Sequence, residues 1–511
     1  MATPQENLAQ ALEALKARQD KGQVAIKSKD LSRTQRERLL KAGFLKRVIK
    51  GWYIPSRPEE TAAGETTTWY ASFWDFCAAY LKDRFADEWS LSPEQSLLIH
   101  AGNRTVPNQL MIRAPKARNN VTRLARDTSI VEVRATIAEG DALEEVDSLR
   151  VFKLPHALVN STEKFFKSHP TDARSALARI KDASELLAIL LEGGRSTVAG
   201  RLAGALRTID RICMAEEILK TMRAAGHTVN ESNPFQDEVK VSLPEREPSP
   251  YVGRIHTNWQ TMREDILTSF PESPGIPNDK EMYLKEVDKI YVSDAYHSLS
   301  IEGYRVSPEL IEGVRSGDWS PNQLEAGRSP PDQQQRDAMA ARGYWLAFTE
   351  VRKSIEKILA NKNPGDIADH DHGNWYRALF GPGVEAGVLK PADLAGYRND
   401  QVYIRNSKHV PLKKEAILDC MPALFDHLRE EEHPLVRTVL GHWIFVYIHP
   451  YMDGNGRMGR FLMNVMLASG GYPWTVIPVQ RREEYMNTLE SASVQGTIMP
   501  FAKFLASLIK V

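Results

Sequence analysis

The spacing of apolar residues predicts a series of small elements in the first 57 residues. Two helices and three short strands are expected there, the helices over 5–18 and 32–42 and the strands over 24–26, 44–49 and 52–54. Ser32 can cap the second helix, Gly43 can end it, and Lys50-Gly51 suits the tight turn of a hairpin between the last two strands. Helix, helix and hairpin in this order predict a winged helix-turn-helix over residues 1–57.

The pattern changes along the rest of the chain. Residues 58–233 mix both periods, with strands expected over 109–113, 129–133 and 148–153 and helices over 67–83, 175–191 and 201–225, which predicts an α+β domain. Seven of the chain's 29 prolines fall between residues 234 and 277, so residues 234–280 are expected to form a linker or an irregular arm. Residues 281–511 show a strongly helical pattern. The fold class is therefore multidomain, with a mostly α-helical C-terminal domain.

The composition is that of an ordinary globular protein. Its 511 residues suggest about three domains. The three cysteines are odd in number and far apart, which excludes a disulfide framework and a cysteine-based zinc site. The N-terminus has no signal-peptide pattern, and no apolar run reaches the length needed to cross a bilayer. A reducing cytoplasm is the expected location.

The formal charges cancel, at 66 Lys and Arg against 66 Asp and Glu, but they are unevenly divided. Residues 1–57 hold 13 basic and 5 acidic side chains, a net of +8, which leaves −8 on residues 58–511. Cations and amides on the second helix and the hairpin suit base edges and phosphates. The candidate DNA-binding residues are Arg33, Gln35, Arg36, Arg38, Lys46, Arg47 and Lys50. The alternative interpretation is a solvated basic face.

One segment, residues 449–460 (HPYMDGNGRMGR), has the residues for phosphate chemistry. It lies between two apolar helix candidates and ends on the N-terminus of the second, where unpaired N–H groups and the helix dipole attract anions. Gly454 and Gly456 let the backbone approach a ligand closely, and Arg457 and Arg460 share one helix face. A capping turn with surface arginines is the alternative, but so many demanding positions coincide that phosphate chemistry is favoured.

Two further side chains of this segment complete a reactive site. Asp453 is a hard oxygen ligand that suits Mg²⁺ beside a polyphosphate. His449, at the other end of the loop, can accept a proton from an attacking hydroxyl.

The segment resembles the signature of the Fic (filamentation induced by cAMP) family, HPFx[D/E]GNGRxxR, with Tyr451 in place of the usual phenylalanine. The resemblance extends over about 280–508 and implies a Fic domain that transfers AMP from ATP to a Ser, Thr or Tyr hydroxyl of a target protein. It implies that His449 is the base, that Asp453 holds Mg²⁺, and that residues 454–456 cradle the phosphates, Asn455 included. It further implies that Arg457 and Arg460 bind the phosphate tail.

The same resemblance extends to neighbouring segments. Residues 396–411 resemble the β-hairpin flap, which would dock the target as an added strand, and residues 484–508 resemble the closing helices. The asparagine usual near the adenine is replaced, with Ser493 close to that place, so the sequence leaves the base specificity open.

A second motif precedes the first. Residues 298–303 (SLSIEG) resemble the family's inhibitory helix, [S/T]xxxE[G/N], expected over about 290–303. Ser298 and Glu302 share a helix face, and Glu302 is expected to pair with Arg460 and to compete with the nucleotide's terminal phosphate. The alternative is a surface glutamate before a glycine stop.

The N-terminal half resembles a different family. Residues 32–56 are similar to the winged helix of AbiEi-type antitoxins from abortive-infection (toxin–antitoxin) systems, and residues 89–115 are similar to the start of their C-terminal region. The resemblance covers about 1–230 and implies a transcriptional regulator. Dimerisation is compatible with both resembled families.

These observations leave three functions to compare. The preferred one is a self-inhibited protein adenylyltransferase with a DNA-binding N-terminal region. The others are a DNA-binding regulator that uses the Fic region as a nucleotide sensor, and an enzyme that removes AMP. A different nucleotide donor also stays open, because a phosphate cradle does not read the base. His433, His442, Trp375 and Trp443 are expected to be structural.

Overall fold

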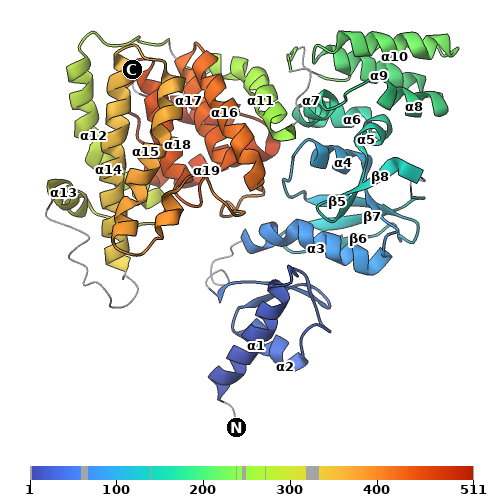
Figure 1. The fold of residues 1–511 in the computed structure, drawn as a ribbon, viewed down its shortest axis with the longest axis horizontal. Helices are drawn as coiled ribbons and strands as arrows, with labels where there is room; N and C mark the ends of the chain where they lie inside the picture. Colours follow the sequence, from blue (N-terminus) through green and yellow to red (C-terminus); the bar gives the residue numbers. More distant parts are fainter. Residues whose placement is uncertain are drawn as a thin grey trace. The chain divides into compact units, whose positions relative to one another are not determined.

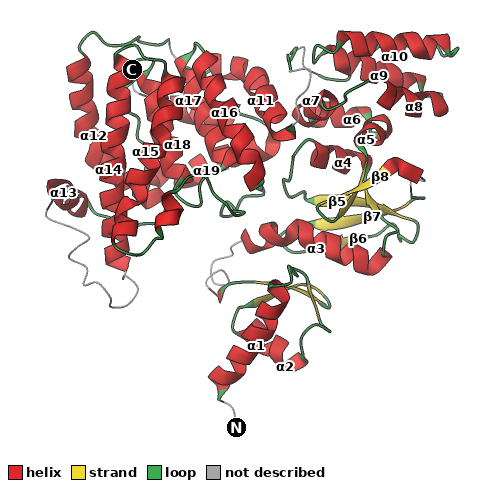
Figure 2. Ribbon diagram, viewed as in Figure 1, coloured by secondary structure: helices red, strands yellow, loops and turns green. Residues whose placement is uncertain are grey.

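The computed structural model describes residues 3–58, 67–137, 140–236, 239–243, 249–270, 272–317 and 333–509. The chain divides into two compact units. Unit 1 comprises Met1–Arg254 and Tyr403–Val410, and unit 2 comprises Ile255–Val402 and Pro411–Val511. Helices dominate both units, and within the described residues every strand belongs to unit 1 (Figure 2). In the same ranges, no helix combines the length and the apolar character that a membrane span requires.

The first 57 residues form two helices and a small antiparallel sheet (Figure 1). The elements are α1 (Pro4–Gln19), β1 (Ile26–Lys27), α2 (Arg33–Lys41), β2 (Leu45–Ile49) and β3 (Trp52–Pro55), with strand order β1-β3-β2. Ser32 caps α2 as expected, and Gly43 and Gly51 adopt φ values of +79° and +86° at the predicted stop and turn. Residues 28–31 form turns and a bend between β1 and α2, and the winged helix-turn-helix topology is not confirmed.

The middle of unit 1 is an α+β arrangement. Its elements are α3 (Thr67–Phe85), β4 (Ser90–Leu91), α4 (Pro93–His100), β5 (Gln109–Ala114), β6 (Val121–Arg123), β7 (Ser129–Arg134), a short 3₁₀ turn (Gly140–Ala142), β8 (Leu143–Val146) and β9 (Leu149–Phe152). The strand order of the larger sheet is β4-β5-β7-β6, with β5 and β7 parallel, and β8 pairs with β9. The aromatic face of α3, with Trp69, Phe73 and Phe76, shares a buried cluster with sheet residues such as Ile112 and Ile130.

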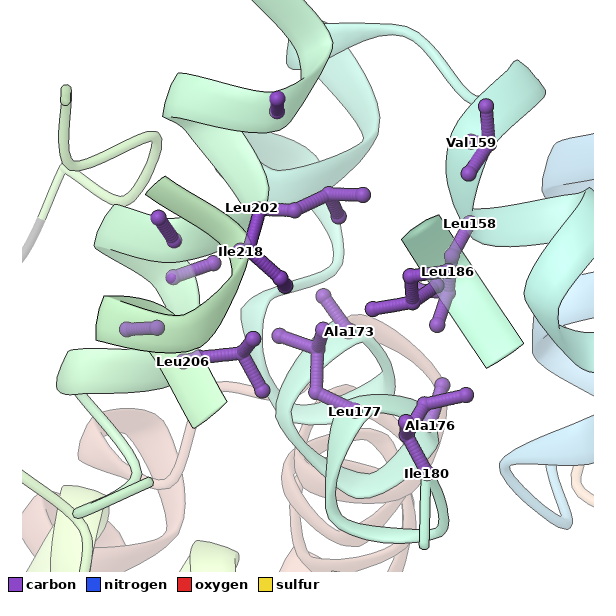
Figure 3. Close-up of a cluster of buried hydrophobic side chains, with 14 of the residues drawn as sticks. Leu158, Val159, Ala173, Ala176, Leu177, Ile180, Leu186, Leu202, Leu206 and Ile218 are labelled. Atoms are coloured by element: carbon purple, nitrogen blue, oxygen red, sulfur yellow. The ribbon is translucent and has the colours of Figure 1, made fainter. Parts of the chain in front are cut away.

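Six helices follow the sheet and share a second core. They are α5 (Leu154–Asn160), α6 (Glu163–Ser168), α7 (Pro170–Ala178), α8 (Ser184–Glu192), α9 (Ser196–Arg207) and α10 (Ile212–Ala224). Leucines such as Leu158, Leu177 and Leu202 point into their common centre (Figure 3). The expectation of single helices over 175–191 and 201–225 is wrong, because each segment breaks. Asp182, which accepts the Ser184 N–H at 2.8 Å, lies at one break, and Asp210, with φ +61°, lies at the other.

The segment expected to be a linker contains a long helix. Helix α11 (Pro250–Leu267) lies inside residues 234–280, and the boundary between the units falls within it. The interpretation of this segment as irregular is therefore wrong for those 18 residues. Residues 237, 238, 244–248 and 271 of the expected linker lie outside the described residues.

Unit 2 is a bundle of helices. Its longer elements are α12 (Lys280–Ile301), α13 (Pro308–Ser316), α14 (Gln333–Leu359), α15 (Pro364–Glu385), α16 (Lys414–Glu430), α17 (Pro434–Ile448), α18 (Asn455–Ala468), α19 (Arg482–Glu490) and α20 (Met499–Ala506). Short turns of 3₁₀ or π helix occupy Pro391–Leu394, Val479–Arg481 and Ser491–Gln495. Helix α18 packs on α14, α15 and α17, and every residue from Arg457 to Ala468 is buried (Figure 1). This central helix carries the site described below.

The expected β-hairpin flap does not form strands. Residues 396–411 consist of turns, bends and irregular backbone. The middle of this segment, Tyr403–Val410, groups with unit 1, where the Val106 N–H donates to the Lys408 carbonyl at 2.9 Å. A hairpin requires paired backbone groups across its two arms, and these residues use theirs elsewhere.

Candidate active site

The loop between α17 and α18 has a backbone shape that few residues allow. His449 ends α17 with a left-handed conformation, φ +56°, and Gly454 precedes α18 with φ +80°. A methyl group on Gly454 would lie 2.7 Å from the Phe380 ring, so a side chain has no room there. Glycine is needed at this position for both reasons, which explains one of the two glycines singled out in the sequence.

The loop is held closed by two of its own residues. The Tyr451 N–H donates to the Asn455 side-chain oxygen at 2.9 Å, and the Asn455 amide donates back to the Tyr451 carbonyl at 2.8 Å. The Tyr451 ring stacks on Tyr376, with ring centres 3.8 Å apart. The side chain of Asn455 is therefore used to shape the loop, and its contribution to a ligand would come from its backbone N–H at the start of α18.

His449 is oriented for proton transfer through one ring nitrogen. Its Nδ1 lies 3.0 Å from the Val446 carbonyl, which fixes Nδ1 as the protonated nitrogen of the neutral ring. Nε2 has no hydrogen-bond partner among the described residues. Burial lowers the pKa of His449 to about 4, so the ring is neutral and able to accept a proton near pH 7.

Two arginines extend along the buried helix α18 from this loop. Arg457 is 2% exposed and Arg460 is 3% exposed. Buried charge is costly unless it is paired, yet Arg457 Nε and Arg460 Nη1 are buried without a hydrogen-bond partner among the described residues. Aromatic rings of Tyr304 and Phe380 lie over the Arg457 guanidinium, at 5.3 and 5.1 Å. The pair leaves hydrogen-bonding capacity for an anion.

Glu302 neutralises part of this charge. It caps the C-terminus of α12, and its Oε1 accepts a hydrogen bond from Arg460 Nη2 at 2.7 Å. Ser298, one turn earlier, accepts from Arg460 Nε at 2.8 Å, so the expected shared face of Ser298 and Glu302 and the expected ion pair are both present. Burial alone would raise the pKa of Glu302, but the two arginines outweigh burial and hold it below its usual range.

The Glu302 carboxylate is in close contact with the start of α18. A methyl group on Gly456 would lie 2.4 Å from Glu302 Oε1 and 3.3 Å from Arg460 Nη1. The carboxylate thus lies against the first turn of the helix, where backbone N–H groups attract anions.

The Asp453 side chain is accessible beside the first turn of α18. Its side chain is 68% exposed, with Oδ1 accepting the Gly454 N–H at 2.6 Å and Oδ2 3.3 Å from Arg457 Nη2. Within the described residues no cluster of three or more ligating side chains could hold a metal by itself. A single accessible carboxylate fits Mg²⁺ when phosphate oxygens and water supply the remaining ligands.

The candidate DNA-binding residues have different surroundings. Gln35 is half-buried and closes the cap of α2 by accepting the Ser32 N–H. Arg36 is also half-buried and donates to the Ser28 carbonyl at 2.7 Å. Arg33 forms a surface pair with Glu37. The side chains of Arg47 and Lys50 are exposed, and those of Arg38 and Lys46 are half-buried.

The residues expected to be structural are placed as follows. Trp375 and Trp443 are each 1% exposed and donate to Ser354 and Ser493, respectively. His442 is fully buried and satisfied by the Gly459 carbonyl and the Tyr485 hydroxyl, both at 2.7 Å. His433 occupies the N-cap position of α17, and its side chain makes no capping hydrogen bond.

The sequence interpretation missed Arg398. This side chain is 4% exposed and donates to the His449 carbonyl at 2.8 Å. The family resemblance includes Arg398 only as a member of the expected flap, residues 396–411. Its distance of 51 residues from His449 along the chain leaves no local pattern from which the contact can be deduced.

Comparison with known proteins places the site in a family. The sequence model of the Fic/DOC family matches residues 373–467. Protein adenylyltransferase Fic from Nematostella vectensis is 29% identical over 236 residues, 45% of this chain and 50% of its own length. Protein adenylyltransferase fic-1 from Caenorhabditis briggsae is 28% identical over 264 residues, 50% of this chain and 46% of its own length. The chain spans about half the length of these curated relatives.

Among solved structures, Fic-1 (residues 134–508) from C. elegans is 17% identical, with a TM-score of 0.35, over 69% of this chain and 91% of its own. A Fic-domain protein from Bacteroides thetaiotaomicron is 19% identical, with a TM-score of 0.33, over 49% of this chain and 92% of its own. The family match includes α17, the loop and both arginines of α18. On the family model alone, residues 373–467 of this chain match a Fic domain.

Proposed function

We propose that the C-terminal region is a protein adenylyltransferase, which transfers AMP from ATP to a Ser, Thr or Tyr hydroxyl of a protein. The observation that supports this most is the pair of buried arginines in the first turns of α18, each with an N–H group that has no hydrogen-bond partner among the described residues. Such a site demands a polyanion, and the neutral His449 beside it supplies a base. The names of the relatives, protein adenylyltransferases, point to the same reaction.

The reaction assigns a role to each residue of the loop. His449 Nε2 takes the proton of the target hydroxyl, the hydroxyl oxygen forms a bond to the α-phosphorus, and the bond from that phosphorus to the bridging oxygen breaks, releasing pyrophosphate. The N-terminal N–H groups of α18 and the two arginines bind the phosphate oxygens and stabilise the charge that moves onto the leaving group. Asp453 would hold Mg²⁺, which neutralises phosphate charge when bound.

The same proposal assigns an inhibitory role to Glu302. With the carboxylate against Gly456 and paired with Arg460, the terminal phosphate of ATP lacks its counter-charge, so the resting protein transfers little AMP. Removal of AMP from a modified target, supported by the same carboxylate, is the alternative direction. Docking of the target along residues 396–411 stays a prediction.

The test is mass spectrometry of proteins incubated with ATP and Mg²⁺. Glu302→Gly protein should acquire AMP on its own hydroxyls or on added lysate proteins, and Glu302→Gly/His449→Ala protein should not. Equal modification by both variants, or none by either, contradicts the proposed activity. Release of AMP from proteins premodified by the Glu302→Gly form, by wild-type protein only, indicates the reverse direction.

We infer DNA binding as a second function, for residues 1–57. The observation that favours it is the cluster of exposed or half-buried cations on α2 and the β2–β3 hairpin, in a segment with a net charge of +8. The double variant Arg47→Ala/Lys50→Ala should weaken binding to upstream promoter DNA in a mobility-shift assay, and Lys21→Ala, an exposed cation after α1, is the matched control. Equal binding by all three proteins contradicts the inference.

A further inference from the structure

We propose that Arg398 is a positioning residue that holds His449 in its reactive place and ties it to the segment expected to dock the target. The proposal rests on the proposed function, because it assigns the reason for which the base must be held. Arg398 lies at the start of residues 396–411 and is almost completely buried. Its side chain donates to the His449 carbonyl, so it acts through His449.

Four hydrogen bonds from Arg398 go to backbone carbonyls of two segments. Its Nε donates to His449 at 2.8 Å, and its own N–H donates to Pro450, also at 2.8 Å. Its Nη1 donates to Asp400 at 2.9 Å and its Nη2 donates to Leu412. The side chain and the N–H of Arg398 together therefore join Asp400 and Leu412, near the two ends of residues 396–411, to His449 and Pro450.

Arg398 contacts the loop at His449, the residue with the strained backbone conformation. His449 has φ +56°, a conformation that costs a residue with a side chain about 1–3 kcal/mol when the surroundings do not hold it. Its N–H bonds to the Phe445 carbonyl at 3.0 Å and its Nδ1 to the Val446 carbonyl, so α17 holds it from one side. Arg398 holds the remaining backbone group, the carbonyl, from the other side.

The charge of Arg398 favours a reactive His449, as its hydrogen bonds do. Burial, first, and to a lesser extent the nearby Arg398 cation lower the pKa of His449, whereas the hydrogen bond to the Val446 carbonyl and the carboxylates of Glu302 and Asp453 raise it. These are the charged groups that face the ring from α12, from the loop and from the flap segment. The cation therefore helps to keep the base neutral, and only an arginine fork also reaches several carbonyls at once.

The experiment compares Arg398→Lys and Arg398→Gln in the Glu302→Gly background, with Arg377→Gln, an exposed arginine of α15, as the control. Transfer of label from ATP is measured for kcat, for KM of ATP and against pH. Both Arg398 variants should lose about 10- to 100-fold in kcat with KM of ATP changed little, because a displaced base affects the chemical step. Unchanged kcat, or a change confined to KM, overturns the proposal.

A second measurement does not depend on activity. Histidine resonances in ring-labelled protein, with His449 assigned by His449→Ala, should show the pKa of His449 rising in Arg398→Gln and staying low in Arg398→Lys, which keeps the charge. A purely structural role would not separate the two variants. An unchanged His449 titration in Arg398→Gln overturns the proposal even if the Glu302→Gly protein transfers no label, in which case the proposed function fails separately.

Discussion

Replacing Glu302 by glutamine should strengthen ATP binding by about 10- to 100-fold, a direct consequence of the contact between the carboxylate and α18. The change keeps the shape of the side chain and removes its charge. Arg460 then loses its counter-charge at 2.7 Å, while its bonds to Ser298 stay. A phosphate entering the site no longer displaces a carboxylate from the guanidinium and from the first turn of the helix.

The magnitude follows from how deeply the pair is buried. The Arg460 side chain is 4% exposed, but the Glu302 side chain is 29% exposed, so water screens part of the attraction. Breaking a fully buried pair costs about 3–5 kcal/mol and an exposed pair contributes about 0–1 kcal/mol, which brackets this pair at about 1–3 kcal/mol. At about 1.4 kcal/mol for each tenfold change, that interval corresponds to the stated gain in affinity.

The assay is isothermal titration calorimetry with ATP and Mg²⁺, in a His449→Ala background that prevents turnover. Glu286→Gln is the matched control, because Glu286 is an exposed residue of the same helix, α12, and pairs only with Lys289 on that helix among the described residues. Its affinity should equal that of the background protein. Equal or weaker binding by Glu302→Gln would refute the reasoning that carboxylate and phosphate compete.

Other consequences of the structure are equally open to test. Gly456→Ala should destabilise the wild-type protein by about 1–3 kcal/mol, because the new methyl group meets Glu302, but not Glu302→Gly protein; a urea-denaturation double-mutant cycle without coupling would contradict this. Asp453→Asn should lower the Mg²⁺-dependent rate of label transfer by about 10-fold or more while ATP binding without Mg²⁺ stays unchanged. Burial lowers the pKa of His442 to about 3 from 6.5, so the unfolded chain binds more protons between these values, and the free energy of unfolding should fall by up to about 1.4 kcal/mol per pH unit as the pH drops below 6.5. Urea titrations at pH 7.5 and 5.5 measure this fall, and a constant value is the contrary result.

The parts of the site that the sequence predicted are local in the chain. The turn at Gly454, the start of α18 and the shared face of Ser298 and Glu302 depend on residues within one or two helical turns of each other. The spacing of these residues along the chain therefore predicts how their side chains lie relative to one another. The ion pair of Glu302 with Arg460 spans 158 residues and was reached through the family resemblance.

The parts that the sequence did not predict depend on distant partners or on weak local signals. Arg398 meets His449 only in the folded chain. The break between α7 and α8 had a signal, since Asp182 and Glu185 both accept backbone N–H groups there, but the apolar period continues across it. The family resemblance predicted a hairpin over residues 396–411, yet the Asp400 carbonyl accepts from Arg398 and the Lys408 carbonyl accepts from Val106 instead of from an opposite arm.

The most direct test of the proposed activity is label transfer from ATP carrying the label on either the α- or the γ-phosphorus. Glu302→Gly protein should become labelled from the α-position and not from the γ-position, and the label should be lost in Glu302→Gly/His449→Ala. Labelling from the γ-position, or α-labelling that does not require His449, would contradict the account of His449 and the arginines of α18 as a site for AMP transfer.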